Sequence, residues 1–313
     1  MASYTDISHE AAHSILGLYG IRDLAQLSPQ KTGISNSNYR VTLKSGDELI
    51  LKISNDKMAS EINEEQKILH FLQTRGYPFS LAPYKTLNGA FVYEWESLTG
   101  VLYPFVKGEV PQVQETNLFE IGKALGQLHL CTIEEPAPSF IRSHRSVGFD
   151  FQDIQMFTEQ ADCPSYFNMA FKKIFDQKAI AKMASLELPQ GLIHGDLYYD
   201  NTLFRDGELI AVLDFEQAGM GEYLFDLGVS ISGSCLKNGL LDKTLIEAYM
   251  KGYQSERPLT DSEAEVLDFY IIIGLFSIAR WRIRRFVEKN IDPTKKENYK
   301  ELLERAINYY ELK

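Results

Sequence analysis

The octapeptide His-Gly-Asp-Leu-Tyr-Tyr-Asp-Asn at positions 194–201 constrains this chain more than any other stretch. It sets Asp196 five residues before Asn201, and Asp214 follows on a second apolar segment. A single loop carboxylate is most often solvated. The pattern H-x-D-x-x-x-x-N would arise by accident in about one chain in a hundred of this size, and the added Asp214 makes an accident rarer. The three polar side chains therefore indicate one chemical site.

Short apolar segments lead into both parts of this site. Residues Gly191 to His194 and Leu209 to Leu213 have the length and composition of buried strands. Thr202 to Phe204 and an Asp206-Gly207 turn lie between them. We expect the loops that follow the two strands to converge on one point.

Asp196, Asn201 and Asp214 suit the tasks that phosphoryl transfer gives to a protein. The reaction needs a carboxylate that orients the attacking hydroxyl, and oxygen ligands that hold magnesium against the phosphates. Magnesium prefers carboxylate, amide and water oxygens, and substrate phosphates usually complete its shell. We expect Asp196 to orient the hydroxyl, and Asn201 and Asp214 to hold Mg²⁺.

On this loop the chain resembles the aminoglycoside phosphotransferase and choline kinase superfamily, which is related to the protein kinases. The family's H-G-D-x-x-x-x-N loop is matched residue for residue at 194–201. Its following D-F or D-W segment is matched by Asp214-Phe215, and Phe225-Asp226-Leu227 is similar to the start of a later family helix. The resemblance covers nearly the whole chain, and the loop is its most specific part.

A second stretch resembles one subgroup. Arg257-Pro258-Leu259-Thr260, preceded by Tyr249 and Tyr253, is similar to the homoserine kinases of this fold. The resemblance implies an α+β, two-lobed, protein-kinase-like fold. Residues 1–107 would form a small nucleotide-binding lobe with an antiparallel sheet, and residues 108–313 a larger, mostly helical lobe for catalysis and acceptor binding. It also implies in-line transfer of the ATP γ-phosphate to a hydroxyl, above all that of L-homoserine in threonine biosynthesis.

A predicted strand pair near the N-terminus supplies a positive group. Residues 38–44 and 48–54 alternate like paired strands around a Ser45-Gly46-Asp47 turn. Lys52 then points away from its apolar neighbours on the strand. It resembles the kinase lysine that pairs with the nucleotide phosphates and with a helix glutamate.

That glutamate is expected on a helix from about Lys57 to Arg75, which stops at Gly76-Tyr77-Pro78. Glu65 matches the family best, because apolar residues follow it in the family's order. Glu61 and Glu64 are the alternatives.

A polar stretch with Gly33, Ser35, Asn36 and Ser37 stands where kinases place a glycine-rich loop over the phosphates. Its small side chains and backbone N–H groups would cover the nucleotide, and an ordinary polar turn is the alternative. A hinge at Lys107-Gly108 would contact the purine through its backbone, which suits ATP and GTP alike.

Homoserine as acceptor requires an acid for its ammonium and an arginine that grips its carboxylate in two places. Arg280 and Arg284 lie four apart on a predicted helix, and Glu216 follows the catalytic segments. A solvated helix face is the alternative for the two arginines. Choline or ethanolamine and aminoglycosides are the rival acceptors, and choline would need an aromatic cage. The candidates for that cage are Tyr198, Tyr199, Tyr223 and Trp281.

Composition narrows the classes of function. A net charge of -11 disfavours nucleic-acid binding, which depends on neutralisation of phosphates by lysine and arginine. The three cysteines are far apart, which disfavours disulfides and a zinc site and favours a reducing cytoplasm. The N-terminus lacks a secretory pattern, and the longest apolar run, 269–279, is too short to cross a bilayer. We expect a cytoplasmic monomer or homodimer without a membrane partner.

The remaining local patterns predict helices after the hinge and a hairpin before it. An Asn88-Gly89 pair predicts a hairpin between 84–86 and 91–95. Asp292-Pro293 is expected to begin the last helix, and a capping box at Thr260 to begin a long one that runs to about Lys289. The other helices are predicted at 115–131, 164–186, 225–234 and 241–254.

His194 and His129 are predicted to be buried structural groups rather than bases. Asp226 is predicted to cap a helix or to brace the catalytic loop. The alternative to an enzyme is a catalytically idle scaffold that binds nucleotide. Degenerate kinases typically lack the lysine, the loop aspartate or the metal aspartate, and this chain has all three.

Overall fold

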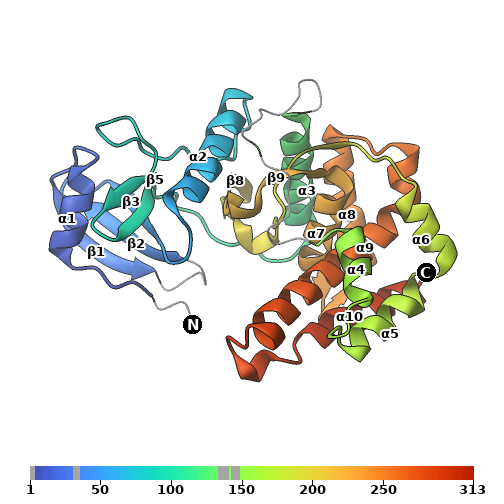
Figure 1. The fold of residues 1–313 in the computed structure, drawn as a ribbon. Coiled ribbons are helices and arrows are strands. Elements are labelled where there is room, and N and C mark those ends of the chain that lie inside the picture. Colours follow the sequence, from blue (N-terminus) through green and yellow to red (C-terminus); the bar gives the residue numbers. More distant parts are fainter. Residues whose placement is uncertain (1–3, 31–35, 133–140, 142–148) are drawn as a thin grey trace. The chain divides into compact units, whose positions relative to one another are not determined.

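The computed structural model describes residues 4–30, 36–132, 141 and 149–313. Its contacts divide the chain into two compact units, Met1–Gly108 and Glu109–Lys313, and each is described by itself (Figure 1). Strands and helices are mixed along the chain, so the expected α+β class is confirmed.

An antiparallel sheet of five strands forms the centre of the N-terminal unit. The strands lie in the order β1 (Leu24–Gln30), β2 (Asn36–Leu43), β3 (Glu48–Ser54), β5 (Leu98–Pro104) and β4 (Tyr93–Trp95). Lys52 of β3 lies opposite Asn38 of β2 and opposite Val101 of β5. β3 is therefore a central strand, paired on both edges.

The two faces of β3 carry different side chains, because successive residues of a strand point to opposite faces. Leu51 and Ile53 are completely buried in the core beneath α1 (His9–Gly17). Lys52 lies between them and points the other way, toward α2 (Ala59–Thr74). The alternation in the sequence predicted this direction correctly.

The predicted hairpin at Asn88-Gly89 is wrong in its strands. The turn itself forms, because the Thr86 N–H donates to the carbonyl of Ala90 at 2.8 Å and Gly89 has a positive φ of 85°. However, β4 begins at Tyr93 and pairs with β5 rather than with residues 84–86. Tyr84 instead donates its N–H to Leu102 of β5.

Helices make up most of the C-terminal unit. In chain order they are α3 (Glu115–Leu130), α4 (Phe151–Thr158), α5 (Ser165–Ile174), α6 (Gln177–Ala184), α7 (Tyr223–Ser234), α8 (Lys243–Glu256), α9 (Asp261–Arg282) and α10 (Tyr299–Glu311). Short antiparallel strand pairs accompany them: β6 (Gln190–Ile193) with β9 (Gly219–Glu222), β7 (Thr202–Arg205) with β8 (Glu208–Val212), and β10 (Leu236–Lys237) with β11 (Leu240–Leu241). The predicted Asp206-Gly207 turn joins β7 to β8, and both of its residues have positive φ, as a tight hairpin requires.

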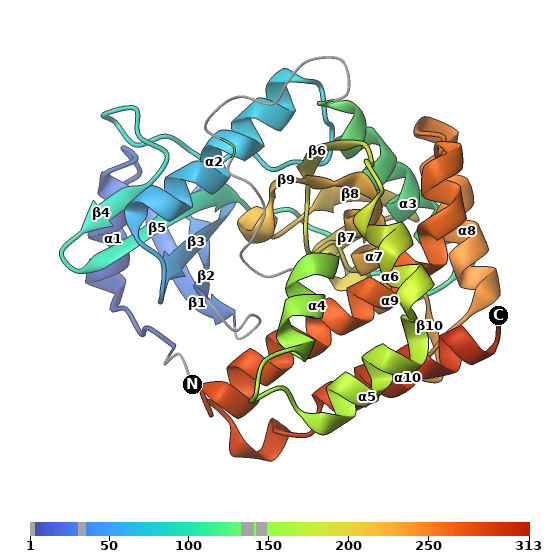
Figure 2. The ribbon, with the colours of Figure 1, turned by 45° about the vertical axis from the view of Figure 1, so that its right-hand side comes forward.

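Two helix pairs of this unit approach each other backbone to backbone (Figure 2). α3 lies beside α8, and α7 lies beside α9. A Cβ added to Gly252 of α8 would lie 1.9 Å from the carbonyl oxygen of Phe119 on α3. One added to Gly228 of α7 would lie 2.2 Å from the carbonyl oxygen of Tyr270 on α9. Neither position has room for a side chain. These two glycines therefore allow each pair of helices to pack at short distance.

Three helix predictions need correction. The single helix expected at 164–186 is two helices, α5 and α6, because Asp176 accepts from the Ala179 N–H at 2.7 Å and caps a new start. The long helix changes after α9 into a π-helix, Ile283–Glu288. Asp292 caps only a short 3-10 turn, Pro293–Lys295, and α10 follows it. In the parts of the chain that are described, no helix combines the length and the apolar composition needed to span a membrane.

Candidate active site

The catalytic loop leaves β6 at His194 and turns sharply at Gly195. Gly195 has a φ of 80°, a backbone conformation that favours glycine. His194 is completely buried. Its Nε2 lies 2.9 Å from the carbonyl oxygen of Leu213, and the Asp196 N–H donates to its Nδ1 at 3.2 Å. Burial lowers the pKa of His194, so the ring is neutral, with its proton on Nε2, and it ties the two loops together.

Asp226 of α7 braces the first residues of the loop from below. Its Oδ2 accepts from the His194 N–H at 2.7 Å, and its Oδ1 accepts from the Gly195 N–H at 2.8 Å. Burial by itself would raise the pKa of Asp226, but hydrogen bonds from His129 and from the His194 backbone lower it below its ordinary value. α7 begins earlier, at Tyr223, so of the two predicted roles Asp226 has that of the brace.

Two serines on the same helix, which were not among the predicted site residues, continue this brace. Ser230 donates to the carbonyl of Leu197, and Ser234 accepts from the Tyr199 N–H at 3.0 Å. Asp226, Ser230 and Ser234 are four residues apart, which places them on one helical face. All three side chains are buried in a helix that is otherwise largely apolar. The spacing D-x-x-x-S-x-x-x-S was the signal that predicts such a polar stripe.

Asn201 and Asp214 lie where the two loops meet. The Asn201 side chain donates to the carbonyl of Asp196 at 2.7 Å, and the Leu213 N–H donates to the carbonyl of Asn201 at 2.8 Å. Asp214 follows directly with a φ of 62°, in the left-handed region that non-glycine residues rarely adopt. The predicted convergence of the two loops is therefore confirmed.

Negative charge surrounds the Asp196 carboxyl group. Burial, followed by the charges of Asp214, Asp200, Asp226 and Glu216, raises the pKa of Asp196 to about 8. A carboxyl group with this pKa is mostly protonated at pH 7. A cation bound beside it would favour the ionised form and lower that pKa.

The oxygen atoms of this region could supply some, but not all, of the ligands of a hard cation. Within the described ranges, no group of three or more histidine, cysteine, aspartate or glutamate side chains could hold a metal ion. The Asn201 amide nitrogen is engaged with Asp196, which leaves its oxygen as the ligand atom beside the Asp214 carboxylate. One carboxylate and one amide make the kind of incomplete protein site that Mg²⁺ shares with phosphate oxygens and water.

In the N-terminal unit, Lys52 lies near the glutamate that the sequence favoured. Its Nζ is 3.8 Å from Glu65 Oε1, and both side chains are largely buried. Glu61 has a different task, because it accepts from the Met58 N–H at the start of α2. The structure therefore brings Lys52 and Glu65 together on the α2 face of the sheet.

The residues predicted for the phosphate loop are only partly described. Gly33 and Ser35 lie outside the described residues. Asn36 begins β2 and is half-buried. Ser37 is completely buried, and its hydroxyl accepts from the Thr5 N–H at 2.7 Å and donates to Asn55 at 3.1 Å. Because this hydroxyl holds the N-terminal segment, we exclude it from the proposed nucleotide contacts.

The two arginines predicted for the acceptor are in different surroundings. The Arg280 guanidinium lies 3.9 Å from the ring centre of Phe157 and is paired with Glu288 at 2.5 Å. Arg284 is exposed on the π-helical segment. The structure therefore does not present them as one matched pair.

The other predicted acceptor residues are distributed over the same unit. Tyr198 lies on the catalytic loop with its ring against Gly233 of α7, where a Cβ would come within 2.2 Å of it. Glu216 is buried just after Asp214. Trp281 packs edge-on against Phe286, 6.1 Å between ring centres, and receives the Arg285 guanidinium on its face. Glu216 and Tyr198 are thus closest in sequence to the loop residues, while Trp281 belongs to an aromatic contact of its own.

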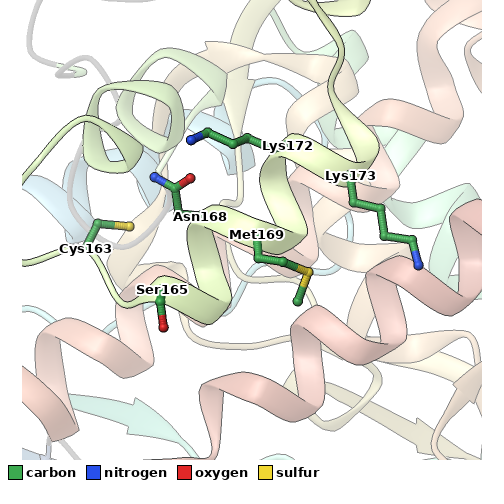
Figure 3. Close-up of a pocket in the computed structure, with 6 residues that line it drawn as sticks. All are labelled: Cys163, Ser165, Asn168, Met169, Lys172 and Lys173. Atoms are coloured by element: carbon green, nitrogen blue, oxygen red, sulfur yellow. The ribbon is translucent and has the colours of Figure 1, made fainter.

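A surface groove of about 620 Å³ lies along α5 and the residues before it (Figure 3). Its described lining consists of Cys163, Ser165, Asn168, Met169, Lys172 and Lys173. Figure 3 shows the Lys172 and Asn168 side chains on one side of α5 and Lys173 on another, and Lys173 is paired with Glu311. The residues predicted for catalysis are not part of this lining.

Comparison with known proteins shows the family of this chain. A model described as the phosphotransferase enzyme family matches residues 26–262. The homoserine kinase of Polaromonas naphthalenivorans (strain CJ2) is 25% identical over 282 residues, which cover 88% of this chain and 87% of that protein.

Solved structures share the fold at low identity. The amicoumacin kinase hAmiN in complex with AMP-PNP, Ca²⁺ and Ami matches with a TM-score of 0.72 and 14% identity over 98% of both chains. The microcompartment-associated aminopropanol kinase matches with a TM-score of 0.72 and 18% identity over 97% of both chains. The family match spans most of the chain and contains the whole catalytic loop. The chain therefore belongs to the phosphotransferase enzyme family and is a phosphotransferase with a hydroxyl group as its acceptor.

Proposed function

We propose that this chain transfers the γ-phosphate of ATP to the hydroxyl group of L-homoserine. The likeness to a homoserine kinase over 88% of the chain supports the acceptor. The fold shared with a kinase solved with AMP-PNP and Ca²⁺ supports ATP and a divalent cation. The observation that carries the mechanism is the half-buried Asp196 carboxyl group with its raised pKa, on a loop whose backbone is bonded to Asp226.

Asp196 orients the acceptor hydroxyl and takes its proton while the oxygen bonds to the γ-phosphorus and ADP leaves. The hydrogen bonds from the loop backbone to Asp226 hold this carboxylate in one place, so that the hydroxyl is aligned before it reacts. Asn201 and Asp214 would hold Mg²⁺, which would supply neutralisation of the charge on the phosphates. Lys52 binds the nucleotide phosphates, and Glu65 keeps its ammonium group in place.

Glu216 is the proposed partner of the acceptor ammonium. It is buried, and it is close enough to Asp196 for its charge to raise the pKa of that carboxyl group. Arg284 is the proposed partner of the acceptor carboxylate, because it is exposed while Arg280 is paired with Glu288. An arginine and an acid on either side of the hydroxyl would distinguish an amino acid from a simple alcohol.

The direct test is phosphate transfer from magnesium-ATP to L-homoserine by the wild type and by Asp196→Asn. We expect turnover by the wild type and a loss of about 10²- to 10⁴-fold in kcat in the variant, the usual contribution of a positioned base. The KM for ATP should stay within about twofold, because Asp196 acts on the hydroxyl. Wild-type turnover by Asp196→Asn would reject the mechanism.

Small amino alcohols are the second candidate acceptors, because an aminopropanol kinase shares the fold over nearly the whole chain. Aminopropanol, ethanolamine and choline belong in the same assay. Arg284→Gln separates the two classes, since an amino alcohol has no carboxylate to lose. A fall in kcat/KM for homoserine alone supports the amino acid, whereas turnover only on an amino alcohol rejects homoserine and keeps the mechanism.

A further inference from the structure

A chain of buried hydrogen bonds leads from the start of α9 to the catalytic loop. The Arg257 Nη2 donates to Glu263 at 2.8 Å, and its Nη1 donates to the hydroxyl of Tyr253 at 2.9 Å. That hydroxyl lies 2.7 Å from Nδ1 of His129, and Nε2 of His129 lies 3.0 Å from Oδ2 of Asp226. The five side chains come from α3, α7, α8, α9 and the residue after α8, and the most exposed of them, Arg257, is only 5% exposed.

The direction of each bond in this chain follows from chemistry. Arginine has only donors, so the Tyr253 oxygen must accept from Arg257. The single tyrosine proton is then left for Nδ1 of His129. With Nδ1 accepting, the proton of the neutral ring is on Nε2, and it is donated to Asp226. All the donors of this hydrogen-bond series therefore point in the same direction, from the permanent cation Arg257 to the carboxylate of Asp226, which holds the loop.

The surroundings of His129 favour this neutral form. Burial lowers the pKa of His129. The ring stacks on Tyr223 with 4.5 Å between ring centres, and the Arg257 guanidinium lies 4.6 Å from the centre of the same tyrosine ring. A second proton on His129 would require the Tyr253 oxygen to accept from both neighbours and would leave its own proton without an acceptor among these groups.

We propose that Arg257, Tyr253 and His129 are positioning residues for phosphate transfer. They act through Asp226, which accepts from the His194 and Gly195 N–H groups immediately before Asp196. The proposal rests on the phosphotransferase activity proposed for this loop. It also assigns a role to Tyr253 and Arg257, which lie far from the catalytic motif in the sequence.

The first test compares His129→Leu with His129→Gln. Leucine removes the donor to Asp226, whereas the glutamine amide can supply one in place of Nε2–H. We expect kcat of the leucine variant to fall about 10- to 100-fold, as displaced catalytic groups do, with both KM values within about twofold. Glutamine should restore most of the loss. A kcat within twofold of wild type in the leucine variant, or an equal loss in both variants, overturns the proposal.

The second test asks whether the residues act as one chain. Tyr253→Phe should lower kcat in the wild type, and should have no further effect when His129 is already leucine, because the chain is then already cut. Tyr309→Phe is the matched control: its hydroxyl bonds to Asp268 at 2.7 Å between α10 and α9, outside the chain. It should leave kcat unchanged in both backgrounds. Additive losses for Tyr253→Phe overturn the proposal.

The third test needs no activity, so it stands even if homoserine is not the acceptor or a leucine variant does not fold. Two-dimensional ¹⁵N NMR of the histidine rings reports the position of the proton, and His129→Gln assigns the signal among the six histidines. We expect a neutral His129 ring protonated on Nε2, with Nδ1 hydrogen-bonded. In Tyr253→Phe the Nδ1 signal should shift to that of a free acceptor. A ring protonated on Nδ1 or on both nitrogens contradicts the chain, whereas failure of homoserine as substrate concerns only the acceptor.

Discussion

The charged groups of the two units are held in different ways. In the C-terminal unit, the completely buried Asp226 accepts hydrogen bonds of 2.7 to 3.0 Å from His129 and from the backbone of His194 and Gly195. In the N-terminal unit, Lys52 and Glu65 are 3.8 Å apart, which is beyond hydrogen-bond distance. The loop is thus fixed by directional bonds, whereas the lysine and glutamate attract each other through charge alone at that distance.

Because of this difference, we expect one group to contribute mainly to the stability of the fold and the other mainly to nucleotide binding. A buried carboxylate that satisfies several donors cannot be removed without leaving those donors unpaired. A lysine whose contact is longer can be replaced at less cost in stability, and its loss is expected to appear in nucleotide binding. A substitution at Asp226 should therefore mainly lower the free energy of unfolding, whereas a substitution at Lys52 should mainly weaken nucleotide binding.

The largest expected effect on stability is that of Asp226→Ala. Three buried donors would lose their acceptor, so we expect the free energy of unfolding to fall by about 3–5 kcal/mol, because each buried donor left unsatisfied costs about 1–3 kcal/mol. Urea unfolding followed by circular dichroism measures this change. Asp200→Ala, at an exposed aspartate of the same loop, is the control and should stay within about 0.5 kcal/mol. Equal losses in the two variants would remove the basis of the comparison.

Acidification should produce the next largest effect. Burial lowers the pKa values of His129 and His194, so the folded chain keeps both rings neutral below pH 6.5, where the unfolded chain binds protons. Stability is therefore lost as the pH falls, by about 1.4 kcal/mol per pH unit for each histidine. Unfolding free energies of Asp196→Asn from pH 7 to pH 5 measure the slope, because Asp196, whose pKa is raised to about 8, would otherwise contribute a slope of the opposite sign over this range. His129→Gln should halve the histidine share of that slope, and His13→Gln, at an exposed histidine, should leave it unchanged.

Close helix packing beneath the loop gives a smaller expected effect. In Gly228→Ala the new methyl group would meet the backbone of Tyr270, so α7 and α9 must move apart. We expect a loss of about 1–3 kcal/mol, the usual cost of an overpacked core, together with a lower kcat because α7 carries the brace. Gly17→Ala is the control, because nothing lies within 4 Å of the added carbon there. Thermal unfolding and kcat would be measured on the same preparations.

The smallest expected effect on stability, with a large effect on binding, is that of Lys52→Met. Methionine keeps the apolar stem, and the 3.8 Å contact contains no hydrogen bond, so we expect a fall of only about 1–2 kcal/mol in unfolding free energy, from the buried Glu65 that loses its cation. Loss of a charged contact to phosphate should raise the dissociation constant of ATP about 10- to 100-fold. Titration with a fluorescent ATP analogue measures it. If Lys52→Met destabilised the protein as strongly as Asp226→Ala, the contrast between directional hydrogen bonds in one unit and charge attraction in the other would be wrong.

Local patterns predicted the elements that depend on neighbouring residues. The β7–β8 hairpin follows from Asp206-Gly207, and the start of α9 follows from the capping box of Thr260 and Glu263. The same kind of reasoning failed at Asp176, where a good capping residue inside an apolar pattern ended one helix and began another. It also failed for β4, whose partner strand was chosen by the sheet and not by the nearest turn.

In the candidate site too, some residues could be predicted from local sequence and others could not. Asp196, Asn201 and Asp214 were predicted from spacing, because they lie within a short stretch of the chain. Ser230 and Ser234 were missed although their spacing is regular, since a serine four residues from an aspartate also occurs on many solvated helices. Only their burial against the loop backbone shows what they do.

By itself, the sequence determined the family and the α+β class of this protein, and it predicted the residues for phosphate transfer. Only the tertiary structure decided how the loop is held. The bonds from Arg257 through Tyr253 and His129 to Asp226 join residues that are up to 124 positions apart in the chain. No local pattern encodes such contacts, because they depend on how closely whole helices pack, and here on glycines that leave no room between them.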